Sequence, residues 1–177
     1  MALTRVPQPT PSDGVGGLPG LILLLRLTFA STRARVLLGR VDLPLAVASL
    51  TWCLPSSIVG AVAGAALLCF GARVVPWRGL PVVHAGNTPG PAAAVGHVLV
   101  FLGSAAEQLR EHEWGHANQS VALGPLYWLV VALPSLAHAC LFALSPGFRG
   151  HHRYLGFYTE AWAQLWAETR HHPLGWR

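Results

Sequence analysis

Residues 111–119 read EHEWGHANQ and place two histidines four positions apart, with a glutamate directly after the first. On a helix, positions i and i+4 share one face, so His112 and His116 can both offer an imidazole nitrogen to one metal ion. Glu113 lies about 100° around the helix from His112, where it can reach a metal-activated water molecule without being a ligand. The spacing therefore provides two ligands and one general base for a zinc site. Gly115 leaves space for substrate or for another helix.

A catalytic zinc ion usually has three protein ligands and one open position, so a third ligand is expected further along the chain. We expect it to be Glu160, at the start of a predicted helix and close in sequence to Phe157, Tyr158 and Trp162. A carboxylate among aromatic residues needs a partner, and zinc would provide one. The alternative is a glutamate that stabilises the first turn of its helix through the helix dipole.

Other residues could also supply the third ligand: Asp42, His138, His151 and His152. His138 lies within an apolar segment and is typical of an interior, hydrogen-bonded histidine. His151 and His152 belong to a predicted loop and could contact substrate or stabilise an oxyanion. His171 and His172 are expected to be solvated. The competing interpretation of the motif itself is coincidence, with its histidines and glutamate on a solvated helix.

The motif is followed by GPLY, LPS and a later glutamate in TEAWA. Together these residues resemble a group of small bacterial membrane proteins with the pattern HExGHxxQ…GPL…PS…E, which look like zincins of the gluzincin type. The resemblance covers roughly residues 77–166. It implies that zinc is held by His112, His116 and Glu160, with Glu113 as the base.

The resemblance also implies residues that support the ligands. Gln119 lies one turn after His116 on the same face of the helix. Gln164 stands where many gluzincins have an acidic residue that holds a ligand histidine. Tyr158, His151 and His152 are further residues expected to support the ligands or to contact substrate.

The composition indicates that part of the chain lies in lipid. Hydrophobic residues make up 53% of the sequence and charged residues 11%, and the mean hydropathy is +0.45. Soluble domains carry about 25% charged residues. The net charge is +5, but the arginines are scattered, which argues against a nucleic-acid-binding protein. Cys53, Cys69 and Cys140 lack CxxC spacing and are interpreted as buried apolar residues.

The clearest candidate for a membrane span is residues 43–72, which contain no charged residue. About 20 apolar residues cross a bilayer, so this run is long enough, with Pro55 at a kink or at the true start. Residues 60–64, GAVAG, form a GxxxG pattern, which either lets another helix approach closely or arises by chance. The arginines before the span outnumber those after it, which favours a cytoplasmic location for the preceding end. Residues 18–30 could form an interfacial helix or a first span.

The segment before the motif predicts strands. Residues 77–87 and 96–103 read as two short strands around a loop rich in proline and glycine, and so predict a β-hairpin. An edge strand here, residues 96–102 or 82–84, could hold an extended substrate. His84 and Asn87 are candidates only as loop residues.

The segment from the motif onwards predicts three helices. Ser104 and Glu107 match a capping box, so a helix is predicted over residues 104–122, ending near Gly124–Pro125. Residues 125–144 form an apolar helix interrupted by Pro134, and residues 155–170 form an amphipathic helix.

Glu160 can reach the two histidines only if the chain returns to them. If residues 121–144 crossed a membrane alone, Glu160 would lie on the far side. The conflict disappears if the motif helix and the apolar segment form an antiparallel hairpin that turns at Gly124–Pro125. The apolar half would then dip into lipid or pack on the span, and the site would lie at the membrane boundary.

The predicted fold is mainly α, a membrane-associated helical bundle with a short β-hairpin before the HExxH helix. Residues 1–17 are expected to be disordered. Residues 18–76 are expected to form a membrane anchor region, with a span near residues 43–72. Residues 77–177 are expected to form a zincin-like metal-site domain, in a protein integral to the bacterial cell membrane.

The expected function is that of a membrane-bound, Zn²⁺-dependent hydrolase, a metallopeptidase with a peptide or protein substrate and membrane lipid as partner. The alternative is a non-catalytic integral membrane scaffold or a degenerate zincin relative. A small transporter would suit Pro134 and His138 inside an apolar segment, but too few clear spans are present. A site-2-type intramembrane protease is disfavoured because no second apolar span carries an aspartate.

Overall fold

The computed structural model describes residues 10–29, 33–36, 41–44, 47, 50–88, 90–104 and 106–169. Its helices are α1 (Gly17–Thr28), α3 (Leu54–Cys69), α4 (Glu107–Leu123), α5 (Leu133–Leu144), α6 (Pro146–His151) and α7 (Tyr158–Thr169). Its strands are β1 (Arg33–Val36), β2 (Val41–Pro44), β3 (Arg73–Trp77), β4 (Leu80–His84), β5 (Ala92–Val95) and β6 (Val98–Phe101). Short 3₁₀ helices cover Pro11–Asp13, Gly124–Leu126 and Tyr154–Gly156, and a π-helical turn, Trp128–Ala132, leads into α5. The prediction of a mainly helical protein is confirmed.

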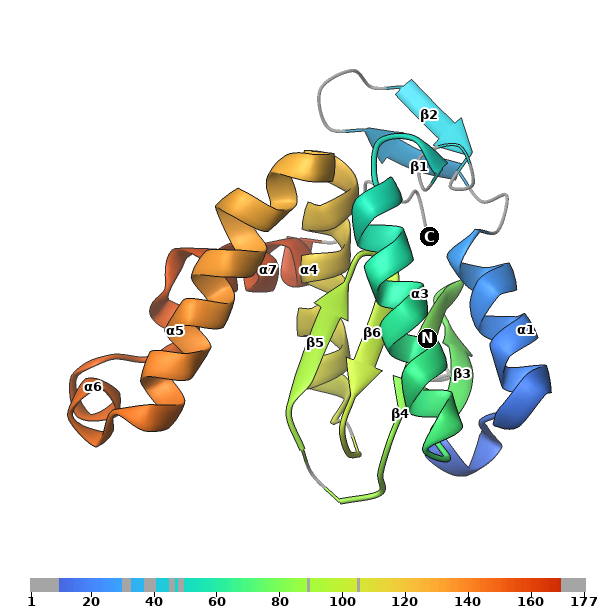
Figure 1. The fold of residues 1–177 in the computed structure, drawn as a ribbon. Coiled ribbons are helices and arrows are strands. Elements are labelled where there is room, and N and C mark those ends of the chain that lie inside the picture. The colour runs from blue at the N-terminus through green and yellow to red at the C-terminus, as the bar shows by residue number, and fades with distance from the viewer. Residues whose placement is uncertain are drawn as a thin grey trace, which may run out of the picture.

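The core is built around a four-stranded sheet with the strand order β3-β4-β6-β5 (Figure 1). Alternate residues of a strand point to opposite faces. Val82 and Leu99 therefore join an apolar cluster with Trp114 of α4, whereas Val83 and Val98 join a second cluster with α1 and α3. Both faces of the sheet are covered, so every residue of β4 and β6 is buried.

The predicted hairpin is wrong in its pairing, because β4 and β6 run parallel. In this sheet the antiparallel hairpins are β3–β4 and β5–β6. Their turns contain residues with positive φ: Arg78 at 48°, Gly79 at 76° and Gly96 at 62°. Such turns suit two-residue hairpin loops. These two turns lie at the beginnings of the two predicted strands, residues 77–87 and 96–103. The antiparallel partner of each predicted strand is therefore the strand that precedes its turn, which is β3 for the first and β5 for the second.

The predicted membrane span is also corrected. Among the described residues in the first part of 43–72, Leu43 and Pro44 end strand β2 and residues 51–53 form a turn, whereas α3 begins only at Leu54 and contains 16 residues. Within the described part of the chain, no single helix has the length and apolarity needed to cross a membrane. A pair formed by Glu107–Leu126 and Trp128–Leu144, which is bent by 119°, meets those two criteria only when taken together.

The GxxxG glycines bring α3 close to other parts of the same chain. A Cβ on Gly60 would lie 2.2 Å from the carbonyl oxygen of Val95, and a Cβ on Gly64 would lie 2.9 Å from Leu24 of α1. At such distances a Cβ would force the neighbouring atoms to move, and at Gly60 the neighbour is backbone. Helices α1 and α3 of the predicted anchor region therefore form one layer of the core, on the face of the sheet opposite to α4.

Helix α4 ends where the sequence predicts but begins later. Gly124 follows its last residue with a φ of 53°, and a Cβ there would lie 2.3 Å from the ring of Trp52. The predicted capping box is wrong: the N-cap is Ala106, which makes no side-chain cap hydrogen bond. The backbone N–H of Ser104 donates to the carbonyl oxygen of Thr88, so Ser104 belongs to the preceding loop.

Helix α5 is not interrupted by its proline. Pro134 lies in the first turn of α5, where proline is tolerated.

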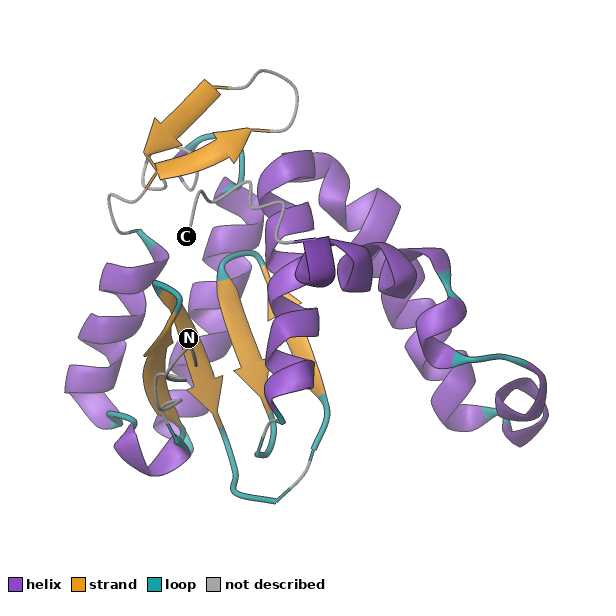
Figure 2. Ribbon diagram, turned by 180° about the vertical axis from the view of Figure 1, so that it is seen from behind, coloured by secondary structure: helices purple, strands orange, loops and turns teal. Residues whose placement is uncertain are grey.

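Helices α5 and α6 extend away from the sheet, and α7 returns to lie against α4 (Figures 1 and 2). A Cβ on Gly115 would lie 2.1 Å from the carbonyl oxygen of Ala163 in α7. Of the two roles considered for Gly115, the structure supports close packing of another helix.

The segment expected to be disordered is residues 1–17. Residues 1–9 lie outside the described residues, whereas residues 10–17 are described, and Val15 pairs with Val74.

Candidate metal centre

His112 and His116 of α4 meet Glu160 of α7. The Nε2 atoms of His112 and His116 lie 2.9 Å and 3.3 Å from the same Oε2 atom of Glu160. The two imidazole rings are nearly perpendicular, at 86°. One possible ligand atom from each of the three residues lies within 4.8 Å of the others, and all three residues are buried. The structure therefore brings the three predicted ligands together, and the group could hold a metal ion.

Two glutamine side chains fix the orientation of the imidazoles. Gln119 donates through Nε2 to the Thr159 carbonyl at 3.4 Å, so its Oε1 faces His116 Nδ1 at 2.8 Å. Gln164 donates through Nε2 to Glu168 at 2.8 Å, so its Oε1 faces His112 Nδ1 at 3.4 Å. An amide oxygen only accepts, so both Nδ1 atoms carry the proton.

With the proton on Nδ1, the Nε2 atom of each neutral imidazole carries a lone pair. The Nε2 atoms of His112 and His116 and the Oε2 atom of Glu160 then direct three lone pairs at one point. Three electron-rich atoms this close repel one another unless a cation lies between them. Either a shared proton or a metal ion must supply that positive charge, and the imidazole-carboxylate donor set suits zinc.

The second oxygen of Glu160 is held by hydroxyl groups. Ser135 of α5 and Thr159, the preceding residue in α7, both donate to Oε1. Because Oε1 is bound in this way, Oε2 is left to face the histidines. Glu160 is 1% exposed, and these bonds partly offset the cost of burying its carboxylate.

The electrostatics of the site favour a cation between the helices. Burial alone would raise the pKa of the Glu160 carboxyl. When a shared proton rather than a metal ion lies between the three residues, hydrogen bonds from His112 and His116, together with the one from Ser135, hold that pKa well below its usual range. Burial lowers the pKa of His116, while Glu160 and Glu113 raise it, and the net shift is upward. The buried negative charge of Glu160 therefore requires positive charge at the imidazoles.

Glu113 lies beside the ligand group without belonging to it. It is 5% exposed, and burial raises the pKa of its carboxyl, although His116, His112 and the backbone of Ala94 act in the opposite direction. Tyr127 donates its hydroxyl proton to the Ala94 carbonyl oxygen at 3.4 Å. Burial, followed by the charges of Glu113 and Glu160, raises the pKa of Tyr127. A carboxylate and a phenol thus flank the ligand group on the side of β5.

The strand nearest to the site is β5, which lies at the edge of the sheet. The two strands considered as edges from the sequence correspond to β4 and β6, which are interior, so that prediction is corrected. The carbonyl oxygen of Pro91 accepts a hydrogen bond from the backbone N–H of Leu102, next to β6. Backbone bonding to an antiparallel partner strand alternates along a strand, so the backbone groups of Ala93 and Val95 also face β6. The backbone of Ala92, like that of Ala94, therefore points outward from the sheet.

Several predicted residues lie away from the ligand group. The Tyr158 hydroxyl donates to the Val130 carbonyl at 2.6 Å, and Tyr158 is 50% exposed. His151 and His152 are exposed at the end of α6 and just after it. His138 is buried as predicted, but it stacks on Phe157 at 4.4 Å, and its Nδ1 has no hydrogen-bond partner among the described residues. The side chain of Asp42 and residues 171–172 lie outside the description.

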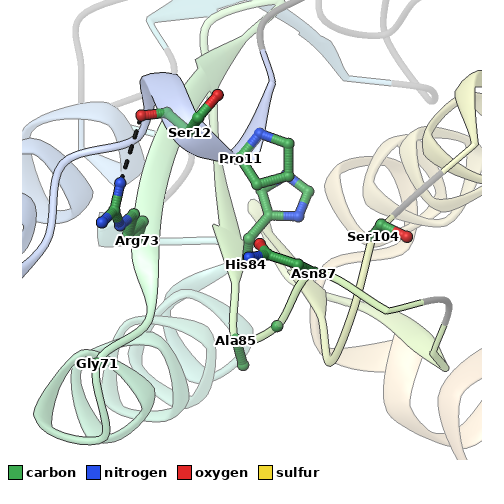
Figure 3. A pocket seen from close by; sticks show the side chains of 9 residues that line it. Pro11, Ser12, Gly71, Arg73, His84, Ala85, Asn87 and Ser104 are labelled. Atoms are coloured by element: carbon green, nitrogen blue, oxygen red, sulfur yellow. Dashed lines mark hydrogen bonds between the residues drawn. The ribbon is translucent and has the colours of Figure 1, made fainter.

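His84 and Asn87 line a separate pocket of about 690 Å³, together with Ser12, Arg73 and Ser104 (Figure 3). His84 ends β4, and its Nδ1 lies 3.3 Å from the carbonyl oxygen of Gly103. None of the residues of the ligand group lines this pocket.

Three residues at or near the site were not predicted from the sequence: Tyr127, Ser135 and Tyr154. Tyr154 lies in the 3₁₀ helix before α7, and burial together with the charges of Glu160 and Glu113 raises its pKa to about 12. Ser135 and Tyr127 belong to the LPS and GPLY segments. A hydroxyl group inside an otherwise apolar run was the signal that could have identified Ser135.

Comparisons with models of known protein families, with curated proteins and with solved structures find no match for this chain.

Proposed function

We propose that this chain is a zinc-dependent hydrolase that cleaves peptide bonds. The observation that carries the proposal is the convergence of three lone pairs, two from imidazoles and one from Glu160, on a single buried point. The resemblance of the HEWGH, GPLY and LPS segments to gluzincin-type membrane proteins supports the same function.

The residues around that point have the properties that hydrolysis requires. Zinc, when bound, would supply Lewis-acid activation of water and of the substrate carbonyl. Glu113, which follows a ligand on the same helix, would take a proton from the attacking water and pass it to the leaving amine. Gln119 and Gln164 would hold the two imidazoles in the tautomer that binds metal.

An extended peptide is the substrate that suits the surroundings of the site. The outward-facing backbone groups of Ala92 in β5 could pair with a peptide strand, as in other cases of strand addition to a sheet edge. Ala94, two residues on, already uses its backbone to hold Glu113 and Tyr127. A peptide bound along β5 would therefore pass beside the proposed base.

Metal analysis tests the proposal most directly. The purified full chain should contain one zinc ion, which His112→Ala, His116→Ala and Glu160→Gln should remove and Glu113→Gln should leave in place. Hydrolysis of a quenched peptide library should be lost in Glu113→Gln despite full zinc content. Wild-type protein that folds but binds no zinc would refute the proposal.

The second candidate is a non-catalytic scaffold in which the metal ion ties α7 to α4. The burial of His112 and His116, both 6% exposed, and the neutral Gln164 in place of an acidic residue favour this candidate. Stoichiometric zinc with no hydrolysis of any peptide, and equal stability in wild type and Glu113→Gln, would support it.

A further inference from the structure

The segment from Leu126 to Leu144 has an outer face without polar side chains. Its exposed residues are all apolar: Leu126, Leu129, Val130, Leu133, Leu136, Ala137, Cys140, Leu141, Ala143 and Leu144. Leu144 is 82% exposed, Leu129 68% and Leu136 60%. Leu126, Leu129, Leu133, Leu136, Cys140 and Leu144 recur at intervals of three or four residues, which is the spacing of one helix face. A helix that faced water would carry charged or polar side chains at such positions.

The inner face of the same segment is fixed by packing. His138 is 5% exposed and stacks on Phe157, while Val131 is fully buried. The Tyr158 hydroxyl binds the Val130 carbonyl, and Ser135 binds Glu160. These contacts set the rotation of the helix, so the apolar outer face cannot turn inward. Together with α6, the segment forms an arm that extends away from the sheet in both views (Figures 1 and 2).

The charged side chains of the arm are all positive. The sequence contains no aspartate or glutamate between Glu113 and Glu160. Arg149 and Arg153 lie at the far end of the arm, where both are exposed, as are the neighbouring His151 and His152. Arginine side chains close to a membrane of anionic lipids strengthen binding to it.

We propose that this arm docks on a bilayer that contains anionic lipids. The outer leucines enter the acyl region, and Arg149 and Arg153 contact the headgroups. Interfaces between proteins usually surround their apolar centre with polar residues and use aromatic anchors. The outer face has neither feature, because its exposed side chains are aliphatic or small and the charged groups lie at one end only. This distribution fits a lipid interface better than a second copy of the chain.

Vesicle flotation tests the proposal independently of zinc. The full chain should float with vesicles of phosphatidylcholine mixed with phosphatidylglycerol, and less with phosphatidylcholine alone. The triple variant Leu129→Glu, Leu136→Glu and Leu144→Glu should bind about tenfold more weakly or worse, because it places three charges in the acyl region. The double variant Arg149→Gln and Arg153→Gln should lose the preference for anionic vesicles.

A matched control uses apolar residues of similar exposure on α1 and α3. The triple variant Leu18→Glu, Ile22→Glu and Val62→Glu should bind vesicles as the wild type does, and circular dichroism should show equal helix content in all variants. Equal loss of binding in the two triple variants would overturn the proposal. A wild type that ignores vesicles but forms a dimer that the arm variant abolishes would also overturn it, since a second copy would then cover the face.

Discussion

Glu160 Oε2 lies 2.9 Å from His112 Nε2, and this contact joins two helices that α5 and α6 separate in the chain. At this contact the chain returns to α4 after it has passed through the arm. Glu160 is 1% exposed, so its charge has to be balanced locally rather than by solvent. The cation that balances it therefore contributes to the packing of α7 on α4 as well as to any chemistry.

Removal of metal should destabilise the fold. A ligand present at 1,000 times its Kd stabilises the folded state by about 4 kcal/mol. We expect a strong chelator to lower the Tm of the wild type and of Glu113→Gln by similar amounts. It should have no effect on Glu160→Gln, which has already lost a ligand. Differential scanning calorimetry with and without chelator measures these differences, and a wild-type Tm that does not respond would contradict the expectation.

Gln119 should matter more for metal affinity than Gln164. Its oxygen lies 2.8 Å from His116 Nδ1, whereas that of Gln164 lies 3.4 Å from His112 Nδ1. Loss of a group that orients a ligand histidine typically weakens metal binding 10- to 100-fold. We expect Gln119→Ala near the upper end of that range and Gln164→Ala near the lower end. Competition with a chromophoric chelator gives both affinities, and the reverse order would show that the bond lengths do not set the effect.

A single methyl group at Gly115 should disturb the site. It would lie 2.1 Å from the Ala163 carbonyl oxygen, so α7 has to move away from α4. Overpacking of this kind costs about 1–3 kcal/mol. We expect Gly115→Ala to lower both the free energy of unfolding and the zinc affinity, because Glu160 moves with α7. Gly147→Ala is the matched control, since a Cβ there meets nothing within 4 Å.

The ligand group could be predicted from the sequence because two of its members, His112 and His116, are defined by their local spacing. The i, i+4 rule places His112 and His116 on one face wherever a helix forms, and a buried carboxylate such as Glu160 needs a partner. The sheet was harder to predict. Its turns at Arg78–Gly79 and near Gly96 follow strands that carry little periodicity, such as the alanines of β5.

The predicted span was wrong for a related reason. Hydropathy records apolar residues but not what covers them. In α3, Gly60 and Gly64 allow the sheet and α1 to cover one face of the helix, while Ile58, Val59 and Val62 remain exposed. In α5 the outer leucines likewise remain exposed, and the hydropathy of the two segments is similar. The three-dimensional packing, rather than the composition, determines which face of an apolar helix is buried.

His97 should make the fold less stable as the pH falls. It is fully buried in the β5–β6 turn, with Nδ1 3.2 Å from the Ser57 hydroxyl, and burial lowers its pKa from 6.5 to about 4. The unfolded chain therefore binds a proton at a higher pH than the folded chain does. This contribution to stability is complete above about pH 6.5 and is lost progressively as the pH falls towards about 4, by about 3 kcal/mol in total.

The change in urea midpoint between about pH 7.5 and about pH 5 measures this contribution. The change should be smaller in His97→Gln than in the wild type, because glutamine does not titrate, even if the variant is less stable at both pH values. His152→Gln is the control, since His152 is exposed and its replacement should leave the change as it is in the wild type. The decisive quantity is the change of the urea midpoint with pH, because a purely structural role of His97 would lower the midpoints at both pH values equally. An unchanged slope in His97→Gln would show that another group causes the acid sensitivity.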